Sequence, residues 1–221
     1  MRLTIVAATG GIGRQLVEQA LAAGHDVTAV VRDPNKITAP VRVVQTDLSD
    51  ADPTALERAV KGADAVLSGL GARTNAEAGV AWRGTRALVD AARATGVRRI
   101  VVVSAAPIGT VPSPEVPNPP RHDPGDGFFM RYLGAPFART AFRTHYADLA
   151  RMEDVIRGSG LDWTVSRPPK LTDKPLTGRY RTALGRNIRG GFSISRADAA
   201  HQMLHCLDQP ETIRQIVGMA Y

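Results

Sequence analysis

The sequence predicts an α/β protein built on a doubly wound, mostly parallel sheet. Short apolar segments alternate with segments of helical periodicity along the first two thirds of the chain. The apolar segments are nearly continuous, which is typical of strands buried on both faces. A glycine-rich turn follows the first of them and opens a helix. Helices on both faces of a parallel sheet, joined by right-handed crossovers, satisfy all three observations.

Length and composition favour one domain over residues 1–221. The chain is 43% hydrophobic and 22% charged, close to globular averages, and 221 residues are few for two full-sized domains. Its one cysteine, Cys206, allows no internal disulfide. We find neither a signal-peptide pattern nor an apolar run of about 18 residues, so we expect a cytoplasmic protein without a membrane contact.

The first half of the chain contains five predicted strands, and its helices have recognisable ends. The strands are expected at residues 3–7, 26–32, 41–47, 63–70 and 98–105. Gly24 caps the helix that follows the glycine-rich turn, and Gly96 ends a longer helix over residues 75–95. Asp52 before Pro53 predicts an N-cap followed by proline at the first helical position.

The chain loses its periodicity between Pro107 and Gly127, where prolines and glycines accumulate. This stretch follows the fifth strand, and in an open α/β sheet that position lies over the carboxyl ends of the strands, where ligands bind. We therefore expect residues 107–145 to form a substrate-side loop or lid, with a flexible surface excursion as the alternative. The segment contains three aromatic residues, Phe128, Phe129 and Tyr132. They could form a wall for a planar ligand, but we favour their packing within the lid.

The periodic pattern resumes beyond this loop. A helix is expected over residues 146–158 and a sixth strand over residues 161–169. Residues 168–195 form an elaboration that contains a short strand in "TGRYRTA". Ser195 and Asp198 then have the spacing of a capping box at the start of another helix, and "IRQIVGM" closes the sheet.

The stretch "VAATGGIGRQL" has the context of a nucleotide-binding turn. It joins the first strand to the first helix and is followed by a second strand at the right distance. Backbone N–H groups at such a turn bind phosphate at the positive end of the helix dipole. Gly10 and Gly13 keep two of the three usual glycines, and Ala7 replaces the first. A methyl group at Ala7 is tolerated if the backbone there keeps a negative φ.

The end of the second strand predicts the form of the nucleotide. Arg32 stands where an acidic residue would bind the ribose 2′-hydroxyl of NAD. A guanidinium binds a 2′-phosphate with two charge-assisted hydrogen bonds, so NADP (NADPH) is the predicted cofactor. Lys36 and Arg14 could assist, although solvated charge is the simpler interpretation for Lys36. If Asp33 faced the ribose instead of Arg32, the preference would weaken.

The net charge of +7 does not by itself predict a nucleic-acid partner. The arginines are dispersed along the chain without a dense run, and few aromatic side chains accompany them. We interpret the basic surface as serving an anionic small ligand, and we expect no specific nucleic-acid partner.

Several motifs, in their order along the chain, resemble one family. They are "AATGGIGRQ", "VVRDP", "TDLSD", "GLGAR", "VVVSA", "SGLDWTVSRPPKLTDKPLTGRY" and "ISRADAAHQML". The chain resembles the atypical short-chain dehydrogenase/reductases of the NAD(P)H-binding type, and among them the flavin reductase/biliverdin-IXβ reductase proteins. The resemblance implies a Rossmann fold and an NADPH-dependent reductase activity. The resemblance does not extend over about residues 107–145. Those proteins bind substrate in this region, so the identity of the substrate stays open.

The resemblance also implies a set of site residues. Those expected around the pyrophosphate are Thr9, Gly10, Gly11, Ile12 and Gly13, with Arg32 at the 2′-phosphate. Asp47 and Leu48 would flank the adenine, and Gly71 and Arg73 would approach the ribose and phosphates near the nicotinamide. Ser104 would lie beside the nicotinamide ring, with Pro168, Pro169 and Lys170 on its other side.

The larger short-chain dehydrogenase family uses an acid–base pair, a tyrosine with a lysine four residues later, which this chain lacks. The residues at that spacing after Tyr132, Tyr146 and Tyr180 are Pro136, Ala150 and Leu184. Alcohol–ketone chemistry and sugar epimerisation, which need a positioned proton donor, are therefore disfavoured. A flavin, quinone or linear tetrapyrrole fits better, because such a planar acceptor can take its proton from water. Ser104 is the catalytic candidate, and capping of local backbone is its alternative role.

The remaining conspicuous residues fit structural roles better. His201 and His205 have the helical spacing of a metal motif, but Gln202 replaces its glutamate and no third ligand is evident, so no metal is expected. His145 could reach the mouth of the pocket, although we favour a surface histidine at a helix start. We interpret Trp163 as part of the core.

Two functions follow from these observations. The first is an NADPH-dependent reductase that transfers a hydride to a small planar substrate. The second is a non-enzymatic, NADP(H)-responsive regulator in which the same site reports redox state to a protein partner through residues 107–145.

Overall fold

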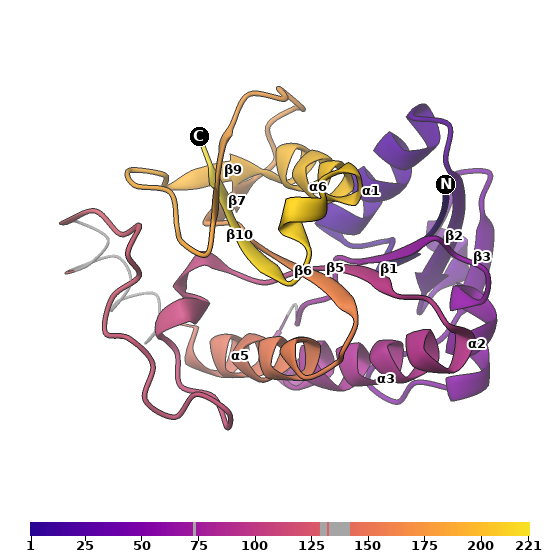
Figure 1. The fold of residues 1–221 in the computed structure, drawn as a ribbon. Helices are drawn as coiled ribbons and strands as arrows, with labels where there is room; N and C mark the ends of the chain where they lie inside the picture. Colours follow the sequence, from indigo (N-terminus) through magenta and orange to yellow (C-terminus); the bar gives the residue numbers. More distant parts are fainter. Residues whose placement is uncertain (73, 129–131, 133–141) are drawn as a thin grey trace.

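A sheet of eight strands lies between two layers of helices (Figure 1). The structure is a computed structural model that describes residues 1–72, 74–128, 132 and 142–221. The strands of this sheet are β1 (Arg2–Val6), β2 (Asp26–Val31), β3 (Arg42–Gln45), β4 (Ala65–Ser68), β5 (Arg99–Val103), β6 (Asp162–Arg167), β8 (Arg181–Leu184) and β10 (Gln215–Ala220). Their order is β3-β2-β1-β4-β5-β6-β10-β8, and every neighbouring pair except β10 and β8 is parallel. This order confirms the predicted doubly wound sheet.

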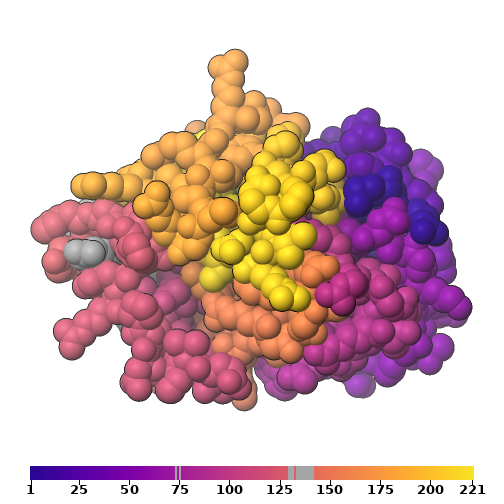
Figure 2. Space-filling model, viewed as in Figure 1, coloured from indigo at the N-terminus to yellow at the C-terminus, as the bar shows by residue number. Residues whose placement is uncertain are grey.

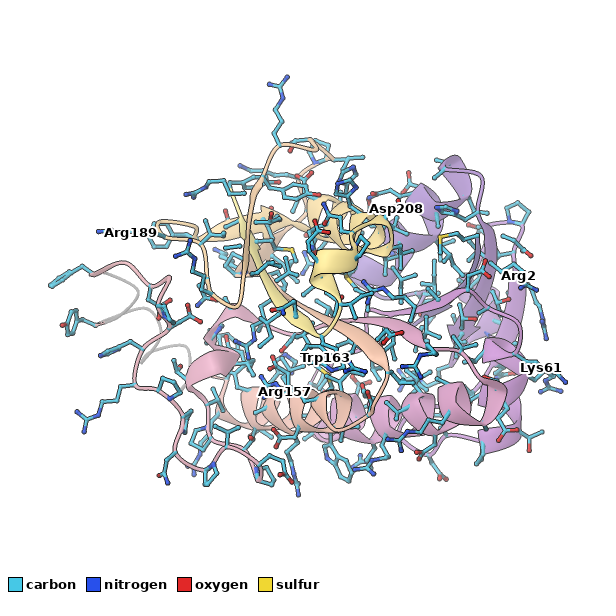
Figure 3. The ribbon with its side chains drawn as sticks, in the orientation of Figure 1. Arg2, Lys61, Arg157, Trp163, Arg189 and Asp208 are labelled. Carbon is cyan, nitrogen blue, oxygen red and sulfur yellow. The ribbon has the colours of Figure 1, made fainter. Side chains whose placement is uncertain are left out.

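Helices cover both faces of the sheet. On one face lie α1 (Gly11–Ala22) and α6 (Arg196–His205), and on the other lie α2 (Pro53–Val60), α3 (Val80–Thr95) and α5 (Arg143–Arg157). Each layer encloses its own cluster of buried apolar side chains. Trp163, at the start of β6 (Figure 3), belongs to the cluster between the sheet and helices α3 and α5, which confirms it as core.

Segments far apart in the sequence meet where α1 packs against α6. The space-filling view shows the C-terminal residues directly beside the N-terminal ones (Figure 2). The side-chain amide of Gln19 on α1 donates a hydrogen bond to the carbonyl of Ala197 on α6, at 2.9 Å. The start of α6 is therefore held close to the start of α1.

The strand register brings several connecting loops to one edge of the sheet. Val6 is level with Val30 in β2 and with Ser68 in β4, and Ser68 is level with Val102 in β5. The loops that follow these four strands consequently leave the sheet side by side. Parallel sheets bind ligands at this carboxyl edge.

The predicted caps are present at the helix ends. The N–H of Thr54 donates to the Asp52 side chain at 2.9 Å, and the N–H of Asp198 donates to the Ser195 hydroxyl at 2.9 Å. Gly24 and Gly96 have φ values of +76° and +75°, the left-handed conformation in which glycine ends a helix at least cost. The sequence thus predicted these ends correctly.

The helix predicted over residues 75–95 is shorter. A single 3₁₀ turn, η2 (Asn75–Glu77), comes first, and α3 begins only at Val80 because Gly79 has a left-handed φ of +90°. The Asp148 carboxylate of α5 accepts hydrogen bonds from the N–H groups of Gly79, Ala81 and Trp82. This cap comes from a residue about 70 positions away, so local spacing could not predict it.

The C-terminal elaboration differs in part from the prediction. The strand expected in "TGRYRTA" is β8, which joins the main sheet as its antiparallel edge, so β10 is not the last strand. Within residues 168–195, β7 (Lys170–Thr172) and β9 (Ser193–Ser195) pair separately. Residues 107–127 are irregular except for the 3₁₀ turn η3 (Ala106–Thr110). Within the described chain, no helix is long and apolar enough to cross a membrane.

Candidate functional site

A cleft of about 610 Å³ follows the carboxyl edge of the sheet from β2 to β5. It brings together most of the residues that the sequence analysis singled out: Thr9, Gly10, Gly11, Ile12, Arg32, Asp47, Leu48, Gly71 and Ser104. Arg32 lies after β2, the glycine-rich turn after β1, Gly71 after β4 and Ser104 after β5. The cleft is therefore an elongated site with Arg32 and Lys36 at its β2 end and the Ser104 hydroxyl at its β5 end.

The glycine-rich turn does not meet the condition under which an alanine at position 7 would be free of strain. Ala7 has φ +56°, not a negative value. This left-handed conformation turns the chain sharply out of β1, and the N–H of Gly10 donates to the Ala7 carbonyl at 2.8 Å. An alanine in this conformation carries a strain of about 1–2 kcal/mol that a glycine would avoid.

Gly13 serves this turn by packing. A Cβ atom at Gly13 would lie only 2.1 Å from the Ala7 carbonyl oxygen, so no larger residue fits. Gly13 is buried and is not among the residues lining the cleft. We therefore assign it to close helix–strand packing, which leaves the N–H groups at the start of α1 beside the cleft.

The β2 end of the cleft carries the predicted cations. Arg32 is exposed, and its guanidinium pairs with the Glu77 carboxylate at 3.3 Å. The Asp33 side chain turns back to accept a hydrogen bond from the Asn35 N–H at 3.1 Å and pairs with Lys36 at 3.5 Å. Arg14 is exposed on α1 and lies outside the cleft lining, so it does not assist Arg32.

The loop after β3 supplies a polar and an apolar wall. Asp47 accepts hydrogen bonds from the N–H and the hydroxyl of Ser49, which lowers the pKa of its carboxyl. Leu48 is buried beside it. The Thr46 hydroxyl oxygen is also buried in this wall and has no hydrogen-bond partner among the described residues. A free buried hydroxyl beside a cleft is suited to bind a ligand.

Ser104 ends β5 and belongs to a buried polar cluster that the sequence analysis missed. Its hydroxyl donates to the Glu153 carboxylate at 2.7 Å. Glu153 is fully buried and also accepts hydrogen bonds from Arg167, at 2.8 Å, and from Arg157, at 2.6 Å. Arg157 (labelled in Figure 3) lies on the same helix as Glu153, α5, four positions later. Glu153 lies on the same buried face of α5 as Leu149, and a charged residue on such a face was the sequence feature that could have revealed this cluster.

The bonding of Ser104 decides what its hydroxyl can do. Its proton is engaged with Glu153, so its oxygen keeps lone pairs for a donor in the cleft. The alternative role, capping of local backbone, does not apply to the hydroxyl. The Ser104 N–H donates to the Ser166 carbonyl at 2.8 Å, which fixes the residue between β5 and β6.

His145 is not a surface histidine. It lines the cleft, its ring Cε1 would lie 3.7 Å from a Cβ at Gly71, and its Nδ1 is buried without a partner among the described residues. Burial lowers the pKa of its imidazole, against an opposing effect of Asp148. The sequence alone could not place His145 in the cleft, because its position depends on how residues 107–145 fold.

The predicted far wall differs from what was expected. Pro168, Pro169 and Lys170 are not among the lining residues, and Lys170 is exposed, whereas Leu171 reaches the cleft. Pro168 is buried and its carbonyl accepts a hydrogen bond from the Ala106 N–H at 2.9 Å. Arg73 lies outside the described residues.

The aromatic residues of the predicted lid do not pack a core. Phe128 is 80% exposed and Tyr132 is 56% exposed, and their rings contact each other with centroids 4.8 Å apart. Phe129 lies outside the described residues. The interpretation of Phe128 and Tyr132 as lid packing is therefore wrong.

Two further groups anchor the C-terminal segment. The Asp198 carboxylate accepts hydrogen bonds from the N–H groups of Thr177 and Gly178, which ties that loop to α6. His201 bonds through Nδ1 to the Tyr180 hydroxyl at 2.6 Å, and burial raises the pKa of Tyr180. Neither Tyr180 nor His201 lines the cleft.

The fold and this cleft agree with comparisons to known proteins. A family model described as NAD(P)H-binding matches residues 7–210, so the chain belongs to the NAD(P)H-binding family. The match confirms the predicted Rossmann-type, nucleotide-binding class.

Individual relatives are similar over nearly the whole chain. SP1627 from Streptococcus pneumoniae, a candidate NADH-flavin reductase, is 26% identical with a TM-score of 0.75, covering 100% of this chain and 99% of that one. ChuY, an anaerobilin reductase from Escherichia coli O157:H7, has a TM-score of 0.76 at 22% identity, covering 100% and 97%. The uncharacterised sugar epimerase YhfK of Bacillus subtilis is 26% identical over 96% of this chain and 90% of its own length. The likeness to SP1627 confirms the predicted resemblance to flavin reductase-like proteins.

Proposed function

We propose that the protein is an NADPH-dependent reductase of a small planar acceptor such as a flavin, a quinone or a linear tetrapyrrole. One observation carries the proposal: a single cleft runs from the cations after β2 to Ser104, which follows β5, and His145, which lies on α5. A dinucleotide laid along it would have its adenosine half at Arg32 and its nicotinamide at Ser104. The names of SP1627 and ChuY support a planar acceptor.

The cationic end favours NADPH over NADH. Arg32 and Lys36 both line the cleft, and the Asp33 carboxylate is engaged with its own turn. A 2′-phosphate would compete with Glu77 for the Arg32 guanidinium, and a dianionic phosphate binds a guanidinium fork more strongly than a carboxylate in water. The ribose 2′-hydroxyl of NADH would gain much less from Arg32.

The acceptor end lacks the usual proton donor. None of the described tyrosines lines the cleft, which argues against ketone reduction and sugar epimerisation. Bound NADPH would supply the hydride, and the protein has to hold two rings in contact. The Ser104 oxygen can accept a hydrogen bond from the nicotinamide carboxamide, and the uncharged His145 imidazole offers a polar contact to the acceptor.

Direct titration tests the nucleotide part of this proposal. Wild-type protein should bind NADPH more tightly than NADH, and Arg32→Ala should remove most of that difference. Catalysis is tested by following NADPH oxidation with FMN, riboflavin and a quinone. A nucleotide sugar is the negative control, because the YhfK relative is named a sugar epimerase.

A second function is favoured by one observation. The exposed Phe128 and Tyr132 offer an apolar contact, which suits a protein partner better than solvent. In that case the protein would report the NADP(H) redox state, and sedimentation with a partner would differ between NADPH and NADP⁺. Equal partner binding in both states would remove this function. A cytoplasmic location and the lack of a specific nucleic-acid partner remain predictions.

A further inference from the structure

Arg196 lies where three segments of the molecule meet. It is the first residue of α6, and its Cδ and Nε atoms would lie 2.6 and 2.7 Å from a Cβ at Gly11, the first residue of α1. Its Nη1 donates to the Asp173 carboxylate at 2.7 Å. Arg196 lines both the nucleotide cleft and the adjacent groove between α1 and residues 173–176.

The electrostatics of α1 make this position unusual. The N-terminus of a helix carries a partial positive charge and stabilises anions, whereas a cation there is unfavourable. Gly10 provides no side-chain cap for α1, and the first turn contains no acidic residue. The fold therefore places a guanidinium beside the positive end of α1, whose first turn supplies no carboxylate.

The partner of Arg196 holds it weakly. The Asp173 side chain is 89% exposed, and ion pairs with so exposed a carboxylate contribute little to stability because water screens them. Rotation of the Arg196 guanidinium away from Asp173 is therefore inexpensive. The Arg196 side chain is one-third exposed, and its Cδ and Nε atoms lie close over Gly11.

We propose that Arg196 binds the pyrophosphate of the dinucleotide, leaving Asp173 for a phosphate oxygen when the nucleotide enters the cleft. This inference rests on the proposed function and adds to it a cationic residue at the phosphate turn. It also assigns a reason to Gly11: a side chain there would displace Arg196. Since Asp173 begins the segment that Asp198 anchors at Thr177 and Gly178, phosphate binding is coupled to one end of residues 173–179.

Two ligands separate this role from that of Arg32. NADPH contains the pyrophosphate, whereas adenosine 2′-monophosphate has the adenine, the ribose and the 2′-phosphate only. Arg196→Ala should weaken NADPH about 10- to 100-fold, as expected for hydrogen bonds to a charged group, and leave adenosine 2′-monophosphate unchanged. Arg32→Ala should weaken both. Arg196→Lys, which keeps the charge and loses the fork, should fall between wild type and Arg196→Ala.

Asp173→Asn tests whether Arg196 is instead a brace for its loop. The proposal expects this variant to bind NADPH at least as tightly as wild type, because the competing carboxylate is gone. If Asp173→Asn and Arg196→Ala weaken NADPH equally, or if Arg196→Ala binds NADPH like wild type, the proposal is overturned. Arg14→Ala, one turn along α1 and outside the cleft, is the matched control and should change NADPH affinity less than about threefold.

The controls keep the two proposals distinct. Thermal melts identify a variant that has not folded, and Arg196→Lys and Asp173→Asn then carry the test. A wild-type protein that binds neither NADPH nor adenosine 2′-monophosphate would remove the proposed function itself. Wild-type binding of both ligands, with no effect at Arg196, would remove only this inference.

Discussion

The two ends of the cleft are built in different ways. At the nucleotide end, Arg32, the glycine-rich turn and Asp47 each follow a strand within a few residues. The Asp33 and Asp47 side chains bond to residues two positions away, and Arg32 additionally pairs with Glu77, 45 positions away. At the acceptor end, Ser104 and His145 depend on contacts with distant residues, such as the bond from Ser104 to Glu153 across 49 positions. Local rules therefore define the first end, and tertiary packing defines the second.

The largest effect should come from breaking the support of the acceptor end. Glu153→Ala leaves the Arg167 guanidinium buried without its carboxylate and should lower the free energy of unfolding by about 3–5 kcal/mol. Glu153→Gln retains hydrogen-bond acceptors and should cost less. Urea unfolding measures both variants.

A surface ion pair provides the control for that experiment. Asp162→Asn removes the exposed pair with Arg98 at 3.2 Å and should cost less than about 1 kcal/mol. Equal losses for Glu153→Ala and Asp162→Asn would show that the buried cluster does not hold this end together.

At the nucleotide end, the sharpest expected effect concerns Arg32. Arg32→Ala should weaken NADPH by about 1.5–3 kcal/mol, the range for hydrogen bonds to charged groups, and should change NADH little. Isothermal titration with both nucleotides measures the difference. Equal weakening of the two would mean that Arg32 does not contact the 2′-phosphate.

Substitution of Ala7 tests whether the glycine-rich turn is strained. Ala7→Gly should stabilise the protein by about 0.5–1 kcal/mol, because relief of the left-handed alanine exceeds the added flexibility of the unfolded chain. Ala8→Gly, at a fully buried neighbour without positive φ, should destabilise it. A loss of stability in Ala7→Gly would contradict the φ value assigned to Ala7.

The smallest effect is a pH dependence at the acceptor end. Burial lowers the pKa of His145 below its ordinary value of 6.5, so the folded protein takes up this proton less readily than the unfolded chain. Stability should therefore fall as the pH drops from about 7.5 to about 5.5, and His145→Gln should lose less over the same interval. An unchanged slope in His145→Gln would place this imidazole in solvent.

The same contrast explains what the sequence could predict. The strand order and the caps at Asp52 and Ser195 follow from periodicity and spacing within short windows, and the structure has them as predicted. The cleft residues that follow β1 and β2 could be predicted for the same reason. They lie within a few residues of a strand end, so the strand positions alone bring them to the carboxyl edge of the sheet.

The misses share a physical cause. The late start of α3 depends on Gly79 and on a carboxylate from α5, and β8 joins the sheet through a pairing that its own sequence does not reveal. Ala7 adopts a positive φ because the turn requires it, against the preference of the residue. His145 turned out to line the cleft because of how α5 packs.

The most direct test of the central claim is NADPH oxidation by the wild-type protein with a panel of planar acceptors. We predict turnover with at least one flavin, quinone or linear tetrapyrrole, a clear preference for NADPH over NADH, and no reaction with a nucleotide sugar. Tight NADPH binding without turnover on any acceptor of the panel would contradict the reductase assignment. That result would favour the redox-responsive regulator.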